Sequence, residues 1–159
     1  MGYDANSLYI CALMQNMPTG SYTRRMAENE FKPKGSIRMA IEWLEWVAHE
    51  ECIQIHHQLN NTVKRIGHRK LPVDGFYLQT QTVYQFHGCY WHGHDCSLNC
   101  RKEFNEKRNK PKAEIREETR ANTEYIKSKG YHVVEMWESE WRDLKKTNRE
   151  LQRFMTTEV

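Results

Sequence analysis

Twelve consecutive residues, from Gln85 to Cys96, contain three histidines, two cysteines and an adjacent pair of aromatic residues. The donors with the spacing of a tetrahedral zinc site are Cys89, His94 and Cys96. His87 and His92 fall outside this ligand set and remain available for chemistry. Because the run follows a strand-like segment, it predicts one short loop that holds a structural metal beside a catalytic group.

Composition favours one principal domain. The 159 residues are 38% hydrophobic and their mean hydropathy is −0.90, so they can bury one core of ordinary domain size. No apolar stretch approaches the roughly 20 residues of a membrane helix, and the first residues lack the layout of a signal peptide. Five cysteines, three of them between Cys89 and Cys100, favour reduced thiols and zinc over a secreted disulfide framework. We therefore expect an intracellular protein without a membrane partner.

Basic residues cluster on both sides of the histidine- and cysteine-rich run, although the net charge is only +3. Those expected to contact nucleic acid are Arg69 and Lys70 before the run, and Arg101, Lys102, Lys107 and Arg108 after it. One basic run alone is as readily explained by a solvated surface. Two runs that bracket one metal loop favour contacts with phosphates, and hence DNA as a partner.

Apolar spacing and turn residues divide the chain into helices and strands. Helical spacing begins at Ser36, a candidate N-cap, and runs to about Asn60. The other expected elements are strands 63–66, 71–78 and 82–86, a hairpin turn at 79–81, a helix 112–129 ended by Gly130, a buried central strand 131–137 and a closing helix 138–155. This order predicts an α/β sandwich around a small mixed sheet. Residues 1–34 are expected to form an appendage to the main domain, 35–159.

A second candidate metal site lies on the predicted sheet. Asp74 lies inside or at the end of one strand, and the next strand ends with Gln85, Phe86 and His87. A hairpin brings Asp74 within reach of the Phe86 carbonyl and the two side chains beside it. Because Mg²⁺ takes oxygen ligands and keeps several waters, a carboxylate and a carbonyl suffice if a substrate phosphate completes the shell. This is the geometry of a metal-dependent phosphodiesterase.

Three motifs carry a resemblance to a known family. They are His-Gly-Cys-aromatic-Trp-His-x-His-x-Cys at 87–96, an aspartate thirteen residues upstream of the first histidine, and Gly-Tyr-x-Val-x-x-x-Trp-Glu at 130–138. With them, the sequence from Ile41 to Trp141 resembles the very-short-patch-repair (Vsr) endonucleases of the PD-(D/E)XK superfamily. The resemblance implies a restriction-endonuclease-like three-layer α/β/α sandwich, a catalytic Mg²⁺, a structural Zn²⁺ and a DNA substrate.

The resemblance also implies roles for individual residues of the catalytic site. Asp74 resembles the magnesium-binding aspartate of the family, and Phe86 stands where a backbone carbonyl ligates the metal. His87 and His92 stand at its active-site histidines. Gln85 occupies the place that other PD-(D/E)XK enzymes give to a second acidic residue, so its amide oxygen is expected to face the metal.

Two further roles follow from the same resemblance. Glu42, in Ala-Ile-Glu-x-x-Leu, resembles an acidic residue that the first helix contributes to the site. Tyr90 and Trp91 occupy the positions at which the family wedges an aromatic pair between bases. The loop between the metal ligands has little room to bury both rings, which independently favours base contact.

The sequence departs from the family at two positions. The fourth zinc ligand of the family is a cysteine, but Ser139 stands at that place, and a neutral serine is a poor zinc ligand. Cys100, four residues after Cys96, is the alternative fourth ligand. A further acidic position of the family falls near Thr119, with Glu118 adjacent. Both departures bear on whether the chain is catalytically active.

The segment from Tyr3 to Tyr9, Tyr-Asp-Ala-Asn-Ser-Leu-Tyr, is similar to motif A of family B DNA polymerases, particularly the protein-primed type of viruses and large DNA transposons. In that family the aspartate binds catalytic magnesium and the tyrosine excludes ribonucleotides. The other carboxylate motif and the template-binding lysine motif are absent, so the chain cannot polymerise DNA alone. The combination suggests a nuclease module inserted into a mobile-element or viral polymerase; an appendage without function is the alternative.

The expected activity is hydrolysis of a DNA phosphodiester, with mismatched or structured duplexes among the candidate substrates. Asp74-bound Mg²⁺ would polarise the phosphate, His92 would accept or relay a proton, and His87 would hydrogen-bond the phosphate or the water. An unperturbed histidine pKa near 6.5 suits this proton transfer. The alternatives are a catalytically inactive, zinc-stabilised DNA-binding module and a fragment of a DNA polymerase. With DNA as substrate, we expect the protein at an intracellular site of DNA, which is the nucleus or a viral replication site if the source is eukaryotic.

Overall fold

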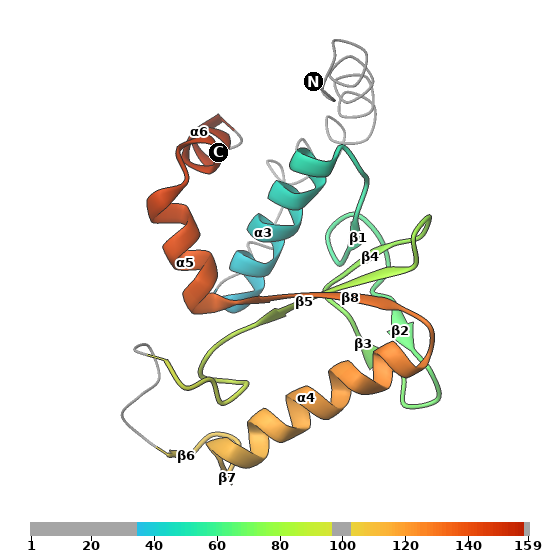
Figure 1. Cartoon of the computed structure of the whole chain (residues 1–159), viewed down its shortest axis with the longest axis vertical. Helices are drawn as coiled ribbons and strands as arrows, with labels where there is room; N and C mark the ends of the chain where they lie inside the picture. Colours follow the sequence, from blue (N-terminus) through green and yellow to red (C-terminus); the bar gives the residue numbers. More distant parts are fainter. Residues whose placement is uncertain (1–34, 97–102, 158–159) are drawn as a thin grey trace.

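The computed structural model describes residues 35–96 and 103–157 (Figure 1). Its four helices are α3 (Ser36–Glu51), α4 (Lys112–Ser128), α5 (Glu138–Thr147) and α6 (Arg149–Thr157). The strands are β1 (His56–His57), β2 (Arg65–Ile66), β3 (Leu71–Pro72), β4 (Gly75–Tyr77), β5 (Thr82–His87), β6 (Phe104–Asn105), β7 (Lys110–Pro111) and β8 (His132–Trp137). The expectation of a mixed α/β protein around a small mixed sheet is therefore confirmed.

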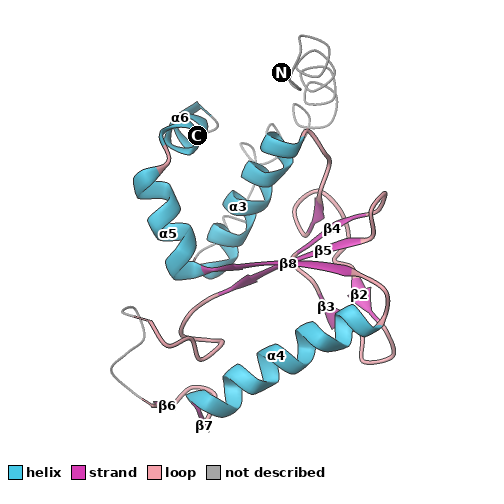
Figure 2. Ribbon diagram, in the orientation of Figure 1, coloured by secondary structure: helices cyan, strands magenta, loops and turns pink. Residues whose placement is uncertain are grey.

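The main sheet has the order β1-β4-β5-β8. Strands β1, β4 and β5 pair antiparallel, whereas β8 runs parallel to β5. The parallel connection between β5 and β8 includes α4, which lies on one face of the sheet (Figure 2). Helices α3, α5 and α6 lie on the opposite face (Figures 1 and 2). Two short ribbons, β2–β3 and β6–β7, complete the described part of the chain.

Strand β5 is buried on both faces of the sheet. Its successive side chains point to opposite faces, so they pack against different helices. Tyr84 and Phe86 join the core formed with α3, α5 and α6, which includes Trp43 and the fully buried Trp141. Val83 points the other way and packs with Ile126 of α4. Because Gln85 and His87 share the alternation of Val83, their side chains face α4. Burial of each large apolar side chain contributes about 1.5–3 kcal/mol.

The first helix ends earlier than its apolar spacing predicts. It stops at Glu51, not near Asn60, because Cys52 adopts a left-handed conformation with φ 55° and the N–H of Ile53 bonds the carbonyl of Ala48 at 3.1 Å. Ile55 then packs against the core, directly before β1 begins. The predicted N-cap is also displaced by one residue, since Gly35 caps the helix.

Three further boundaries differ from expectation. The predicted strand 71–78 is divided into β3 and β4, with Asp74 in the bend between them. Strand β8 is an edge strand of the described sheet, not a central one, and Val134 is 42% exposed. The closing helix breaks at Asn148 into α5 and α6. The hairpin between β4 and β5 and the positive φ of Gly130 after α4 are confirmed.

The other expectations about the chain concern its N-terminal segment, membrane-spanning helices and the state of its cysteines. The polymerase-like segment within residues 1–34 lies outside the described residues. No helix in the described part of the chain is long and apolar enough to cross a membrane. Cys52 is disulfide-bonded, so the expectation of reduced thiols is wrong for this residue, whereas Cys96 is a free thiol within the described residues.

Candidate functional site

A cleft of about 600 Å³ lies where the end of β5 faces α4, and it contains most of the residues expected to be catalytic. Its lining includes Asp74, Gln85, Phe86, His87 and His92 from the sheet and the loop after it, and Thr119, Asn122 and Thr123 from α4. Thr119 and Thr123 are four residues apart, so both project from one face of the helix. The fold therefore brings Asp74 and His87 into one cleft, as the hairpin argument predicts, and His92 from the following loop lines the same cleft.

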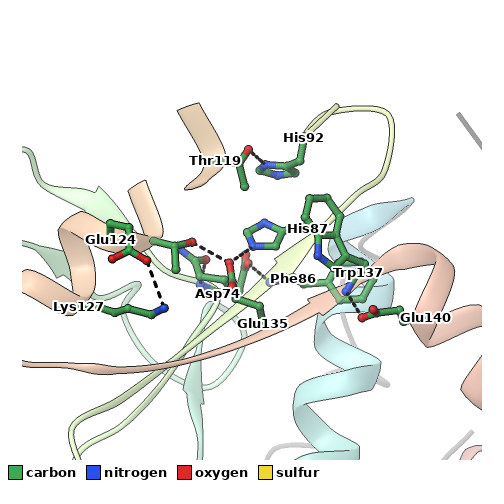
Figure 3. Close-up of polar contacts among 12 residues, drawn as sticks. Asp74, Phe86, His87, His92, Thr119, Glu124, Lys127, Glu135, Trp137 and Glu140 are labelled. Atoms are coloured by element: carbon green, nitrogen blue, oxygen red, sulfur yellow. Dashed lines mark hydrogen bonds and ion pairs between the residues drawn. The ribbon is translucent and has the colours of Figure 1, made fainter. Parts of the chain in front are cut away.

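Asp74 is held by the strand beside it (Figure 3). Its Oδ2 accepts a hydrogen bond from the backbone N–H of Phe86 at 2.8 Å, and its own N–H donates to Gln85 Oε1 at 3.4 Å. Burial raises the pKa of Asp74, while the Phe86 hydrogen bond and the neighbouring His87 side chain oppose this effect. The carboxylate is therefore positioned but poorly solvated, which is typical of functional sites.

Glu135 is a residue of the site that sequence reasoning missed (Figure 3). In the register between β5 and β8 it lies opposite Gln85, on the sheet face that meets α4. Its Oε1 lies 2.8 Å from His87 Nε2 and accepts the hydroxyl of Thr123 at 2.7 Å. The hydrogen bond with His87 lowers the pKa of Glu135. The available signal was a carboxylate within the otherwise apolar run Val-Val-Glu-Met-Trp.

His92 is oriented by a hydroxyl of α4. Its Nδ1 lies 3.0 Å from Thr119 Oγ1, and that hydroxyl donates its proton to the carbonyl of Ile115 at 3.0 Å. His92 Nδ1 must therefore carry the proton in this contact, which leaves Nε2 as its acceptor. Burial lowers the pKa of His92 to about 4, assisted by His87 and Arg108. The premise of an unperturbed pKa near 6.5 is wrong for this residue.

The predicted zinc ligands form one cluster. The donor atoms of Cys89, His94 and Cys96 lie within 4.8 Å of one another, and Cys89 Sγ is 3.3 Å from His94 Nδ1. Burial raises the pKa of the Cys89 thiol, as expected for a soft ligand shielded from water. Ser139 Oγ lies 3.4 Å from His94 Nδ1, so the serine stands beside the donors. Cys100 lies outside the described residues. The donor set is compatible with a metal such as zinc.

Trp137, at the end of β8, joins the metal cluster to the cleft. Its ring stacks on His94 with centroids 4.3 Å apart and an interplanar angle of 18°. It also contacts His87, with centroids 4.7 Å apart. Gly93, between these histidines in sequence, has φ 66° and lies against the backbone of Lys112 at the start of α4. The loop is therefore seated against both β8 and α4.

The aromatic pair lies at the surface beside the cleft. Tyr90 is 37% exposed and Trp91 is 42% exposed, and their rings meet edge to face at 5.3 Å. The buried Asn105 holds this turn by donating to the carbonyl of Tyr90 at 2.8 Å. Lys107 lies over the Trp91 ring at 5.6 Å, and Arg108 donates to the Trp91 carbonyl at 3.1 Å. Aromatic rings and cations thus share one surface, as nucleic-acid contacts require.

Other predicted site residues lie apart from the cleft or outside the described chain. Glu42 pairs with Arg38 at 2.9 Å and with Lys145 at 3.1 Å, and it is not part of the cleft lining. Arg69 lies over the Tyr125 ring at 4.7 Å. The other cations of the predicted DNA surface are Lys70, whose carbonyl accepts from Arg65, and Arg101 and Lys102, which are outside the described residues.

Glu118, the acidic neighbour of Thr119, is engaged by cations. It pairs with Arg108 at 2.9 Å and with Lys110. It lines a second, smaller pocket together with Trp91, His92 and Asn122. Thr119, and not this carboxylate, therefore contacts His92.

Comparisons with protein-family models, with curated proteins and with solved structures give no match for this chain. The function is therefore argued from the geometry of the cleft, the metal cluster and the surface between them.

Proposed function

We propose that the protein is a metal-dependent endonuclease that hydrolyses phosphodiester bonds of DNA. The observation that carries the proposal is the cleft that a half-buried carboxylate, Asp74, lines together with His87 and His92, beside an exposed aromatic and cationic surface. Helices on both faces of a small mixed sheet are compatible with the restriction-endonuclease-like sandwich that the sequence motifs imply. The proposed substrate is duplex DNA, with mismatched or structured sites as candidates.

The donors around Asp74 fit a hard cation. Its Oδ2 is held by the Phe86 N–H, whereas its Oδ1 makes no hydrogen bond to the described residues. Gln85 places an amide oxygen at the same end of β5, and the Phe86 carbonyl completes the proposed oxygen set. Bound Mg²⁺ would polarise the phosphate and lower the pKa of an attacking water.

The histidines can accept hydrogen bonds in this cleft. His92, with its proton on Nδ1 and a pKa of about 4, is neutral at physiological pH and offers Nε2 as an acceptor. Its low basicity makes it better suited to hold a water than to keep a proton. His87 is held by Glu135, on the side of its ring away from His92.

The surface beside the cleft supports DNA as the substrate. Tyr90 and Trp91 are exposed where a planar base can stack, and Lys107 is held near the Trp91 ring. Arg108 is fixed by Trp91 and Glu118, so it can present charge to a phosphate without ordering a free side chain. The zinc cluster would hold this loop in place.

The proposal is tested by cleavage of end-labelled duplexes, matched and T:G-mismatched, with Mg²⁺, with Mn²⁺ and after chelation. We expect metal-dependent products from the wild type and none from Asp74→Asn, whose amide can still accept the Phe86 N–H. Asp143→Asn, which removes an exposed carboxylate of α5, is the matched control and should cleave normally. Equal cleavage by wild type and Asp74→Asn would rule out the assigned metal site.

The second candidate function is an inactive, zinc-stabilised DNA-binding module. Specific observations favour it: Gln85 and Thr119 are neutral where the related enzymes carry acids, and Glu42 is paired with Lys145. Under this alternative, DNA binds with steep salt dependence and no product appears with either metal. A role within a mobile-element or viral polymerase is a further proposal, for which residues 1–34 provide the sequence support.

A further inference from the structure

The contact between His87 and Glu135 joins the two parallel strands β5 and β8. His87 ends β5, and Glu135 lies on β8 opposite Gln85, so both side chains face α4. Glu135 Oε1 lies 2.8 Å from His87 Nε2 and 2.7 Å from the hydroxyl of Thr123. Figure 3 shows the His87 ring between the carboxylate of Glu135 and the ring of His92. The His87 ring is thus fixed from two elements.

The donors and acceptors of this contact leave one arrangement of protons. An ionised carboxylate only accepts, and the hydrogen bonds that Glu135 receives lower its pKa. The hydroxyl of Thr123 donates to Oε1. His87 Nε2 must then carry the hydrogen that it shares with Oε1. In the neutral ring, the lone pair is on Nδ1.

His87 Nδ1 is the atom that this arrangement leaves without a partner. It is buried and has no hydrogen bond within the described residues, and the residue is only 4% exposed. The ring lies in the cleft that contains Asp74, 4.7 Å from the ring of His92. Buried polar atoms are normally paired, so an unpaired acceptor at this place indicates where a ligand binds.

His87 and His92 therefore have opposite ring nitrogens available as hydrogen-bond acceptors. His92 donates from Nδ1 to Thr119 and keeps Nε2 as its acceptor, whereas His87 donates from Nε2 and keeps Nδ1. Their supports also differ, because Thr119 is a neutral hydroxyl and Glu135 is a carboxylate. A carboxylate holds the partner ring more strongly and balances positive charge that develops on it.

We propose that Glu135 is a positioning residue that fixes His87 with its proton on Nε2 and presents Nδ1 as a hydrogen-bond acceptor. The group it receives is the donor that the hydrolytic reaction supplies, the attacking water. Thr123 completes the support by holding Glu135 Oε1. The inference rests on the proposed nuclease function for its catalytic meaning, but the proton position on His87 is independent of activity.

The experiment compares four variants of the whole chain. Glu135→Met removes the acceptor and preserves approximate length, Glu135→Gln retains an amide oxygen that can accept from Nε2, and Thr123→Val removes only the second support. Glu124→Gln is the control, because this exposed α4 carboxylate pairs with Lys127 away from the cleft. Ring-nitrogen NMR shifts of His87 at about pH 8 report the tautomer of the neutral ring. Mg²⁺-dependent cleavage of duplex DNA gives kcat and KM for each variant.

We expect the Nε2–H tautomer in the wild type, Glu135→Gln and Glu124→Gln, and a mixture or the Nδ1–H tautomer in Glu135→Met. The kcat of Glu135→Met should fall by about 10- to 100-fold with little change in KM, because the ring remains but is no longer oriented. Glu135→Gln should recover part of that loss, and Thr123→Val should show a smaller one. Far-UV circular dichroism checks that each variant is folded.

Two results would overturn the inference: the Nδ1–H tautomer in the wild type, or a Glu135→Met variant with unchanged tautomer and kcat. Failure of the proposed function is recognised separately. If the wild type cleaves no DNA with Mg²⁺ or Mn²⁺, the nuclease proposal and the catalytic meaning of Glu135 are both wrong. In that case, the NMR comparison of the wild type with Glu135→Met still decides whether Glu135 positions His87.

Discussion

The metal-binding loop and the Asp74 cleft are adjacent, but they relate to stability in opposite ways. In the loop, three donors already converge within 4.8 Å, so a bound metal would add free energy to the folded state. In the cleft, burial raises the pKa of Asp74 and lowers that of His92 to about 4, and His87 Nδ1 has no described partner. A metal-bound loop would therefore stabilise the fold, whereas the cleft removes ionisable groups from water, which disfavours their charged forms.

The largest effect that tests this contrast is removal of the loop metal. Cys89→Ala, or chelation of the wild type, should abolish stoichiometric zinc and lower the thermal midpoint by more than any cleft variant. Zinc binding to small structural sites has a free energy on the order of 10 kcal/mol. A domain whose fold is largely formed without the metal should lose several kcal/mol of stability when the zinc is removed. Metal analysis and thermal melts measure both quantities. Asp95→Asn, an exposed loop carboxylate, is the control, and a zinc-independent melt would contradict the structural role.

The next largest effect on stability is expected where the loop packs against α4. Gly93 has φ 66°, and a Cβ there would meet the Lys112 carbonyl and the Ile115 side chain. Gly93→Ala should therefore lower the free energy of unfolding by about 2–3 kcal/mol, from backbone strain and a steric clash together. Gly130→Ala is the matched control, because it has φ 90° with no atom near the added Cβ and should cost about 1 kcal/mol. Urea unfolding measures both; equal losses would show that Gly93 is not tightly seated.

The same two regions explain how much of the molecule could be predicted from its sequence. The loop ligands lie within eight residues, Cys89 to Cys96, so spacing alone identified them. Asp74, Gln85 and His87 followed from one hairpin. Glu135 is 48 residues from His87, and only the register of β5 with β8 reveals their contact. A glutamate within an apolar strand stands out in the sequence, but the local pattern does not indicate which residue it contacts.

Element boundaries failed where two periodicities overlap. The apolar residues beyond Glu51 fit a longer helix, but Ile53 and Ile55 are also two residues apart, and β-branched side chains favour extended backbone. The apolar run of β8 is the same for a central strand and for an edge strand covered on one face. Tertiary context, which local spacing does not contain, decided both cases.

A smaller effect sharpens the loop side of the comparison. Ser139 Oγ lies beside His94 Nδ1, so Ser139→Cys would place a thiolate next to the three donors. We expect zinc affinity to rise by at least about tenfold, or about 1.4 kcal/mol, because the variant completes a four-donor soft site. Competition with a zinc chelator measures the change. Ser128→Cys, on the exposed end of α4, adds a thiol away from the cluster and should have no effect; an unchanged affinity in Ser139→Cys would indicate another fourth ligand.

The smallest expected effect tests the cleft side. Because burial raises the pKa of Asp74, its ionised form is favoured less in the folded chain than in the unfolded one. The resulting loss of folding stability is absent below pH 3.8, the ordinary pKa of the carboxyl, because it is protonated in both states. The loss develops as pH rises through the raised pKa of the folded state. Asp74→Asn should therefore stabilise the metal-free protein at neutral pH, by about 0.5–2 kcal/mol, while abolishing cleavage.

Urea titrations of the wild type and Asp74→Asn, at neutral pH and again near pH 4, measure this difference and its sign. The gain should shrink on acidification, because the wild-type carboxyl becomes protonated and the two side chains then differ little in charge. Mg²⁺ should reverse the order at neutral pH, since only the wild type would bind it and be stabilised by mass action. Asp143→Asn, whose carboxylate is exposed on α5, should show neither effect. If Asp74→Asn instead destabilises the metal-free chain, the hydrogen bond to the Phe86 N–H outweighs burial, and Asp74 belongs with the loop as a stabilising element.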